Sequence, residues 1–136
     1  MFVTYQKGEI ARMKVLLRAA EKGIVVCVPT VEARYDLVME IDGTLHRVQV
    51  KYTDCMTKCA SGSVFLDLRK ETRNNGKKRP YTKKEVDLIL VYVLKTDTVV
   101  CLEPKHFHNK HSLTLRYDVP ANNQKKNVHL ISEMTW

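Results

Sequence analysis

The residues best suited to chemistry are three polar side chains placed around one Asp-Gly dipeptide. Asp36 precedes Asp42-Gly43, while Gln49 and Lys51 follow it. Asp-Gly between two strand-like runs is typical of a two-residue hairpin loop, because a type I′ turn needs positive φ at both positions. Counting outward from this loop puts Asp36 opposite Gln49, and the period of two puts Lys51 on the same face. The expected pairs are Ile41 with Thr44, Glu40 with Leu45, Val38 with Arg47 and Asp36 with Gln49.

A group of oxygens beside an ammonium group suits the hydrolysis of a phosphodiester. Asp36 offers Mg²⁺ a hard anionic ligand, Gln49 offers a carbonyl oxygen, and the intervening backbone at Val50 offers another. Lys51 can orient or deprotonate the attacking water, or stabilise the charge that builds on the phosphate. The alternative is a hairpin whose outer face is polar because water lies there, with Asp36 and Lys51 as an ordinary surface ion pair.

A fourth candidate, Glu9, lies on the first predicted element. Residues 6–22 are expected to form an amphipathic helix that ends at Gly23. Its apolar positions are Ile10, Met13, Leu16, Leu17 and Ala20. Helical spacing puts Glu9 on the inward stripe of Met13, Leu16 and Ala20, where it could bind the same ion, a second ion or a metal-bound water. The alternative is that Glu9 only places negative charge in the first turn, where it suits the helix dipole.

The remaining pattern predicts a sheet. Strand-like runs occupy residues 24–28, 35–41, 44–52, 63–68, 86–94, 99–103 and 112–119, and residues 128–136 fit a strand or a helix. The continuous apolar run 86–94 belongs inside a sheet that is covered on both faces. We therefore expect an α/β fold with a mixed central β-sheet flanked by helices. The length of 136 residues and the absence of a linker indicate one domain over residues 1–136.

The formal charge of +8 favours a polyanionic partner such as nucleic acid. Basic side chains gather in residues 69–84, with Gly76 as a mobile tip, and a smaller group follows near residue 125. They suit phosphates, and the asparagines and arginines could reach base edges. The DNA-binding candidates are Arg69, Lys70, Arg73, Asn74, Asn75, Lys77, Lys78, Arg79, Lys83, Lys84, Lys125 and Lys126. A merely solvated basic loop is the alternative.

Cysteine and histidine usage does not indicate a second metal site. Cys27, Cys55, Cys59 and Cys101 form no CxxC pair, so we expect reduced thiols, with Cys27 and Cys101 in the core. His106, His108 and His111 lie in a polar segment that is more typical of a surface than of a metal centre. Neither a long apolar run nor a secretory signal is visible, which predicts a cytoplasmic protein with no membrane partner.

Several short runs of this sequence also resemble a known protein superfamily. GEIA on the first helix, RYDLV on the second strand and VQVK after the hairpin resemble the PD-(D/E)XK nuclease superfamily. With the later runs YTKKEVDLILVYV and LTLRYDVPANNQKKNVHL, nearly the whole chain is similar to the PD-(D/E)XK homing endonucleases encoded in bacterial group I introns, as in cyanobacterial tRNA genes.

The resemblance implies a restriction-endonuclease-like core and Mg²⁺-dependent hydrolysis of both strands of a long DNA target, with Mn²⁺ as a substitute ion. It assigns the helical acid to Glu9, the acidic metal ligand to Asp36 and the catalytic lysine to Lys51. Gln49 departs from the Glu or Asp that most members have, so one negative charge is missing and weaker metal binding is expected. Glutamine at this position also occurs in related branches.

One active site per chain cannot conveniently cut two strands, which predicts a homo-oligomer of at least two chains. The resemblance points to a tetramer, and the apolar segment ending at Trp136 is a plausible interface. Two other functions stay open. One is a Holliday-junction-resolving nuclease of the same fold, and the other is a catalytically inactive DNA-binding module, in which Gln49 in place of an acidic residue indicates that activity has been lost.

Overall fold

The structure is a computed structural model that describes residues 2–54, 62–72, 75–119, 122 and 126–136. Its elements follow in chain order. They are α1 (Thr4–Glu21), β1 (Val25–Cys27), β2 (Leu37–Ile41), β3 (Thr44–Thr53), β4 (Ser63–Asp67), β5 (Arg69–Glu71), β6 (Lys78–Pro80), β7 (Leu88–Val93), β8 (Thr98–Leu102), α2 (Pro104–Phe107), β9 (Ser112–Arg116) and α3 (Ile131–Met134).

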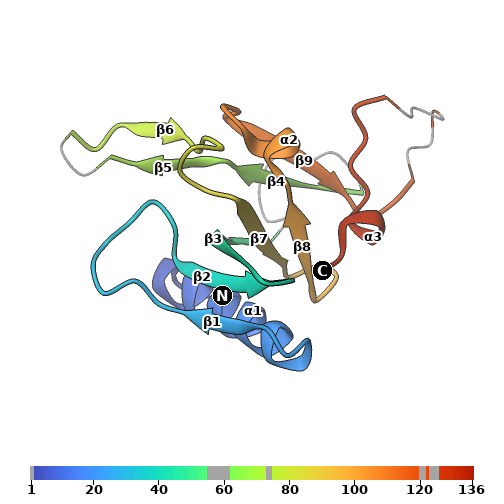
Figure 1. The fold of residues 1–136 in the computed structure, drawn as a ribbon. Helices are drawn as coiled ribbons and strands as arrows, with labels where there is room; N and C mark the ends of the chain where they lie inside the picture. The colour runs from blue at the N-terminus through green and yellow to red at the C-terminus, as the bar shows by residue number, and fades with distance from the viewer. Residues whose placement is uncertain (1, 55–61, 73–74, 120–121, 123–125) are drawn as a thin grey trace.

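Five strands form the central sheet, in the order β1-β2-β3-β7-β8 (Figure 1). β3 and β7 run parallel, whereas the other neighbouring pairs are antiparallel. The predicted mixed sheet is therefore confirmed. β7 lies between β3 and β8, which agrees with the internal position expected for the apolar run 86–94.

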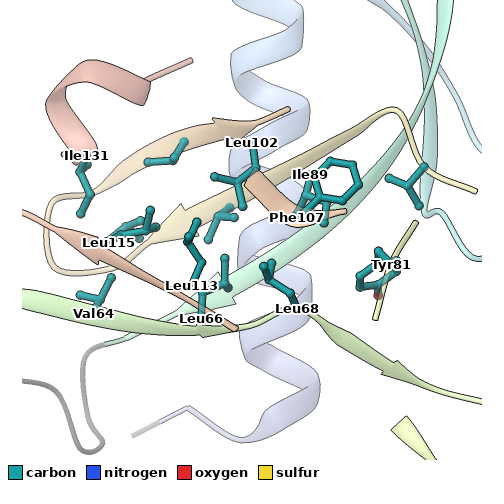
Figure 2. Close-up of a cluster of buried hydrophobic side chains, with 14 residues drawn as sticks. Val64, Leu66, Leu68, Tyr81, Ile89, Leu102, Phe107, Leu113, Leu115 and Ile131 are labelled. Atoms are coloured by element: carbon teal, nitrogen blue, oxygen red, sulfur yellow. The ribbon is translucent and has the colours of Figure 1, made fainter. Parts of the chain in front are cut away.

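The two faces of β7 enter two different hydrophobic clusters. Leu90 and Tyr92 pack with α1, and Ile89, Val91 and Val93 pack with β4 and β9. Figure 2 shows the second cluster, in which side chains from the paired strands β4 and β9 meet those of the central sheet. One long helix thus covers one face, and a two-stranded sheet covers most of the other. The short helices α2 and α3 add Phe107 and Ile131 to this second cluster, and residues 112–116 pair with β4 and not with the central sheet.

The buried side of α1 differs from the predicted stripe. Ala11, Val15 and Ala19 are buried, whereas Met13 and Leu17 are 62% and 59% exposed. The prediction was wrong because it followed the large apolar side chains. Small alanines at this spacing let the helix backbone approach the sheet closely, so they occupy the centre of the interface, Ile10 and Leu16 pack at its margin, and Met13 and Leu17 face outward.

The end of α1 and the strand after it correct another expectation. Gly23 has φ +69° and its amide donates to the carbonyl of Ala20, so the predicted helix stop is confirmed. β1 was expected to be buried, but Val25 is 58% exposed and Cys27 is also exposed. β1 is an edge strand, and among the described strands only β2 pairs with it. Cys101, on β8, is half-buried.

The C-terminal residues form hydrogen bonds with α1 and β8 of the same chain. After α3, the backbone amide of Trp136 donates to the Val99 carbonyl at 2.8 Å, and Arg18 Nε donates to the Trp136 carbonyl at 2.7 Å. The predicted interface element therefore packs on α1 and β8. In the described part of the chain, no helix is both long and apolar enough to cross a membrane.

Candidate active site

The hairpin that carries the predicted site has the expected register. Its pairs run from Ile41 with Thr44 to Leu37 with Val48, and Val38 pairs with Arg47. Asp42 and Gly43 have φ of 51° and 76°, as a type I′ turn requires. One residue before β2, the amide of Asp36 donates to the carbonyl of Val48 at 2.9 Å. This extension holds Asp36 beside the middle of β3.

Asp36, Gln49 and Val50 are joined by hydrogen bonds. Asp36 Oδ2 accepts from Gln49 Nε2 at 2.8 Å and from the amide of Val50 at 3.1 Å. Gln49 Nε2 also donates to the Val50 carbonyl at 3.1 Å. Gln49 is only 6% exposed, and its Oε1 is buried with no hydrogen-bond partner among the described residues. A buried acceptor without a donor costs free energy unless a ligand satisfies it.

These groups fit a hard cation. Asp36, Gln49 and the Val50 carbonyl together offer one anionic and two neutral oxygens, the donor type that Mg²⁺ prefers. In the structure it is Nε2 of Gln49 that faces Asp36 and the Val50 carbonyl, so the amide would turn over to bring Oε1, which is buried with no partner among the described residues, toward those two oxygens. The described residues contain no cluster of three or more His, Cys, Asp or Glu side chains that could hold a metal ion. A site here therefore depends on the amide and the backbone as well as on the single carboxylate of Asp36.

Lys51 reaches toward the region where the chain leaves β4. Its Nζ donates to the Arg69 carbonyl at 3.2 Å and lies 5.2 Å from the centre of the Tyr81 ring. Burial lowers the pKa of Lys51 to about 8, an effect that the charges of Asp67 and Asp36 partly offset. An amine with this pKa is partly neutral near pH 8, so it can accept a proton from water as well as donate one.

Glu9 is not joined to this group. It is half-buried on α1, which packs on the Leu37 and Val48 face of the hairpin, the face opposite Gln49 and Lys51. No hydrogen bond or ion pair links Glu9 to the other site residues in the part of the chain that the structure describes. Its role in metal binding stays a prediction, and the inward stripe from which that role was argued is not the buried face.

The basic segment 69–84 is a second hairpin, formed by β5 and β6, which we call the arm. Several of its charges already have partners. Arg69 forms an ion pair with Asp67 at 3.0 Å, and Lys78 Nζ lies 3.8 Å from the same carboxylate. Arg79 pairs with Glu85 at 2.6 Å. These interactions hold the guanidinium and ammonium groups at the base of the arm.

Other predicted DNA-contacting residues are exposed and lie on the arm, shortly after β6, or after β9. They are Asn75, Lys77, Lys83, Lys84 and Lys126. Lys70 is half-buried, and its Nζ donates to the Ala33 carbonyl at 3.1 Å. The predicted contacts Arg73, Asn74 and Lys125, and the thiols of Cys55 and Cys59, fall outside the described residues.

Sequence reasoning missed four residues that surround Lys51 and the arm: Arg34, Asp67, Tyr81 and Glu85. The guanidinium of Arg34 lies 4.6 Å from the centre of the Tyr81 ring, the same ring that Lys51 approaches. Burial alone would raise the pKa of Glu85, but the neighbouring Arg79 and Arg34 hold it below its ordinary value. No local spacing signals this cluster, because its members are brought together from distant parts of the chain.

The three histidines do not converge. His108 Nδ1 accepts from the amide of Lys83, and the His111 carbonyl accepts from Leu68. His106 instead lies edge-on to His129, with 5.6 Å between the ring centres.

Comparison with known proteins identifies the family of this chain. The model of the PD-(D/E)XK endonuclease family matches residues 2–135, so this chain belongs to that family. Among solved structures, the bacterial homing endonuclease I-Ssp6803I is similar, with 27% identity, a TM-score of 0.71, and coverage of 92% of this chain and 84% of that one. MepB has 10% identity and a TM-score of 0.44, covering 85% of this chain and 87% of that one. No curated protein sequence matched. The resemblance inferred from the sequence is confirmed.

Proposed function

We propose that this chain is a site-specific homing endonuclease that makes a double-strand break in DNA by Mg²⁺-dependent hydrolysis and serves the mobility of a group I intron. The observation that carries the proposal is the meeting of Asp36, Gln49 and Lys51 at the base of a basic arm, with one buried oxygen of Gln49 lacking a donor among the described residues. The likeness to a bacterial homing endonuclease supports the choice of substrate.

Each residue has a distinct part in this proposal. Asp36, Gln49 Oε1 and the Val50 carbonyl would hold Mg²⁺, and Mn²⁺ would substitute. The ion when bound supplies positive charge to the scissile phosphate and acidifies a water molecule. Lys51 takes a proton from the attacking water or donates a hydrogen bond to the phosphate oxygen that gains charge. Tyr81 and the Arg69 carbonyl keep its ammonium group in place.

Cutting both strands requires two such sites, so we infer a homo-oligomer that acts on duplex DNA, at least a dimer and in our proposal a tetramer. Exposed apolar side chains support self-association. Met13 and Leu17 on α1, and Val25 and Val28 at the sheet edge, are each more than half exposed. Such side chains are commonly covered when subunits assemble.

The decisive experiment is selection of cleaved sequences from a randomised duplex pool with Mg²⁺, with EDTA and Lys51→Ala as controls. We expect a long enriched target and cleavage at least about 10³-fold slower in the lysine variant. Four-way junctions are included as a competing substrate. Preference for junctions without sequence selection would favour the resolving nuclease, and binding without cleavage in Mg²⁺ and Mn²⁺ would favour an inactive binding module.

A further inference from the structure

The arm is attached to the rest of the molecule by few elements. In Figure 1 it extends beyond the central sheet, and the connection between β1 and β2 rises toward it. Among the described strands, β5 and β6 pair only with each other. Cavities of about 240 and 160 Å³ lie between the arm and residues 28–36. Leu68 and Tyr81, which flank the arm, are buried in the core, and hydrogen bonds join the arm to Ala33 and Arg34 in the connection between β1 and β2.

Arg34 supplies three of the hydrogen bonds that join the arm to the rest of the chain. Its Nη2 donates to the carbonyls of Pro80 at 3.0 Å and Arg79 at 3.3 Å on β6, and its Nη1 donates to that of Lys70 at 3.5 Å on β5. One planar guanidinium therefore holds both strands of the arm, which a lysine ammonium could not do with the same geometry. A return contact runs from Lys70 Nζ to the Ala33 carbonyl at 3.1 Å.

The same guanidinium is connected to the candidate active site. It lies 4.6 Å from the centre of the Tyr81 ring, and Lys51 Nζ lies 5.2 Å from that centre. Arg34 Nε also lies 3.4 Å from Glu85 Oε2, while the other oxygen of Glu85 pairs with Arg79. The Arg34 side chain is 19% exposed, so these interactions are largely shielded from water.

We propose that Arg34 is a positioning residue that fixes the direction of the arm relative to Lys51 and Asp36. A duplex held by the arm then presents one phosphate to the site in one orientation. This role rests on the proposed nuclease function, and Arg34 acts through the arm and Tyr81 without touching the reacting atoms. A misplacement of about 1 Å can cost about 100-fold in rate, which is the scale of effect at stake.

The first test uses the full chain without DNA or metal. Hydrogen exchange is compared in wild type, Arg34→Lys and Arg34→Met, with Arg12→Lys and Arg12→Met as matched controls on α1. We expect the amides of β5 and β6 to exchange at least about tenfold faster in both Arg34 variants, with the amides of β2 and β3 unchanged. Unchanged exchange in the arm would overturn the positioning role whatever the enzyme activity. If Arg34→Met does not fold, Arg34→Lys decides the result.

The second test separates binding from cleavage on the selected duplex. For Arg34→Lys we expect a Kd within about threefold of wild type, a single-turnover rate about 10–100-fold lower, and cuts spread over neighbouring phosphates. A wild-type rate in Arg34→Lys would show that charge alone suffices and would overturn the proposal, as would a rate loss explained entirely by Kd. If wild type cleaves no duplex, the nuclease proposal itself fails, a result distinct from unchanged exchange in the arm.

Discussion

Two hairpins formed by the described strands have glycine in their turns, and they are supported differently. β3 of the first hairpin lies between β2 and β7, and Val48 on its inner face is fully buried. The second hairpin, the arm, pairs only with itself among the described strands and is held by Arg34 and Lys70. The candidate catalytic groups thus lie on a hairpin that is held within the central sheet. Most candidate DNA contacts lie on the arm, which projects from it (Figure 1). Substitutions in the first hairpin should alter chemistry, and those in the arm should alter affinity.

The largest expected effect comes from comparing a substitution in the first hairpin with substitutions of exposed lysines on and near the arm. Asp36→Asn should lower the cleavage rate at saturating enzyme by about 10³-fold with little change in Kd, because it removes the only carboxylate of the proposed metal site. The double variant Lys77→Ala, Lys83→Ala, at exposed lysines on the arm and shortly after it, should weaken binding and leave the saturated rate unchanged. It should also lower the slope of log K against log salt by about 0.9 for each DNA phosphate that is no longer neutralised. Binding titrations at several salt concentrations and single-turnover assays test both.

The next prediction concerns Gln49→Glu. Gln49 Nε2 donates to Asp36 Oδ2 and to the Val50 carbonyl, whereas a glutamate would put a second carboxylate beside Asp36. We expect the Tm in EDTA to fall by about 5 °C and the rise in Tm on adding Mg²⁺ to exceed that of wild type. Gln6→Glu, at an exposed position on α1, is the matched control. An unchanged Tm in EDTA would argue against the hydrogen-bonded arrangement.

Glycine substitutions probe the two turns directly. Gly43 has φ +76° and Gly76 has φ +65°, and an added Cβ would meet no atom within 4 Å at either position. Alanine at each should cost only the strain of positive φ, about 1–2 kcal/mol. Gly43→Ala should lower the free energy of global unfolding by that amount, whereas Gly76→Ala should loosen only the arm. Urea unfolding measures the first effect, and hydrogen exchange in β5 and β6 the second. Equal urea midpoints for the two variants would contradict the comparison.

The smallest effect concerns the contact that ties the chain after the arm back to β3. Arg47 Nε donates to Asp87 Oδ2 at 3.0 Å, and this hydrogen bond holds the pKa of Asp87 below its ordinary value despite partial burial. The stabilisation is therefore complete above the unfolded-state pKa of about 4 and is lost as pH falls through the lower folded-state pKa. Asp87→Asn should cost about 1 kcal/mol at pH 7, because the pair is partly exposed.

This pH dependence is measured by urea unfolding between pH 7 and pH 3. The difference between Asp87→Asn and wild type should shrink as pH falls below about 4. Asp42→Asn is the control, since the turn tolerates either residue with positive φ and Asp42 is exposed. A difference that stays constant down to pH 3 would show that the ion pair does not contribute in this way.

Local signals in the sequence determined the first hairpin. The Asp42-Gly43 turn permits positive φ at both positions, and the alternation of residues on either side then settles the register, which places Asp36 beside Gln49. Gly23 ended the helix for a similarly local reason. The continuous apolar run 86–94 indicated a strand with two covered faces, and both hydrophobic clusters include it.

Only the tertiary structure decided which side of α1 is buried and what surrounds Lys51. The buried side follows from the close approach that Ala11 and Ala19 permit, which helical periodicity of large side chains does not reveal. Arg34 and Lys51 both lie against the Tyr81 ring because the connection between β1 and β2 folds back toward the base of the arm (Figure 1). Such contacts join residues far apart in the chain, so no local pattern of residue types encodes them. They depend on how the sheet, the arm and that connection pack together.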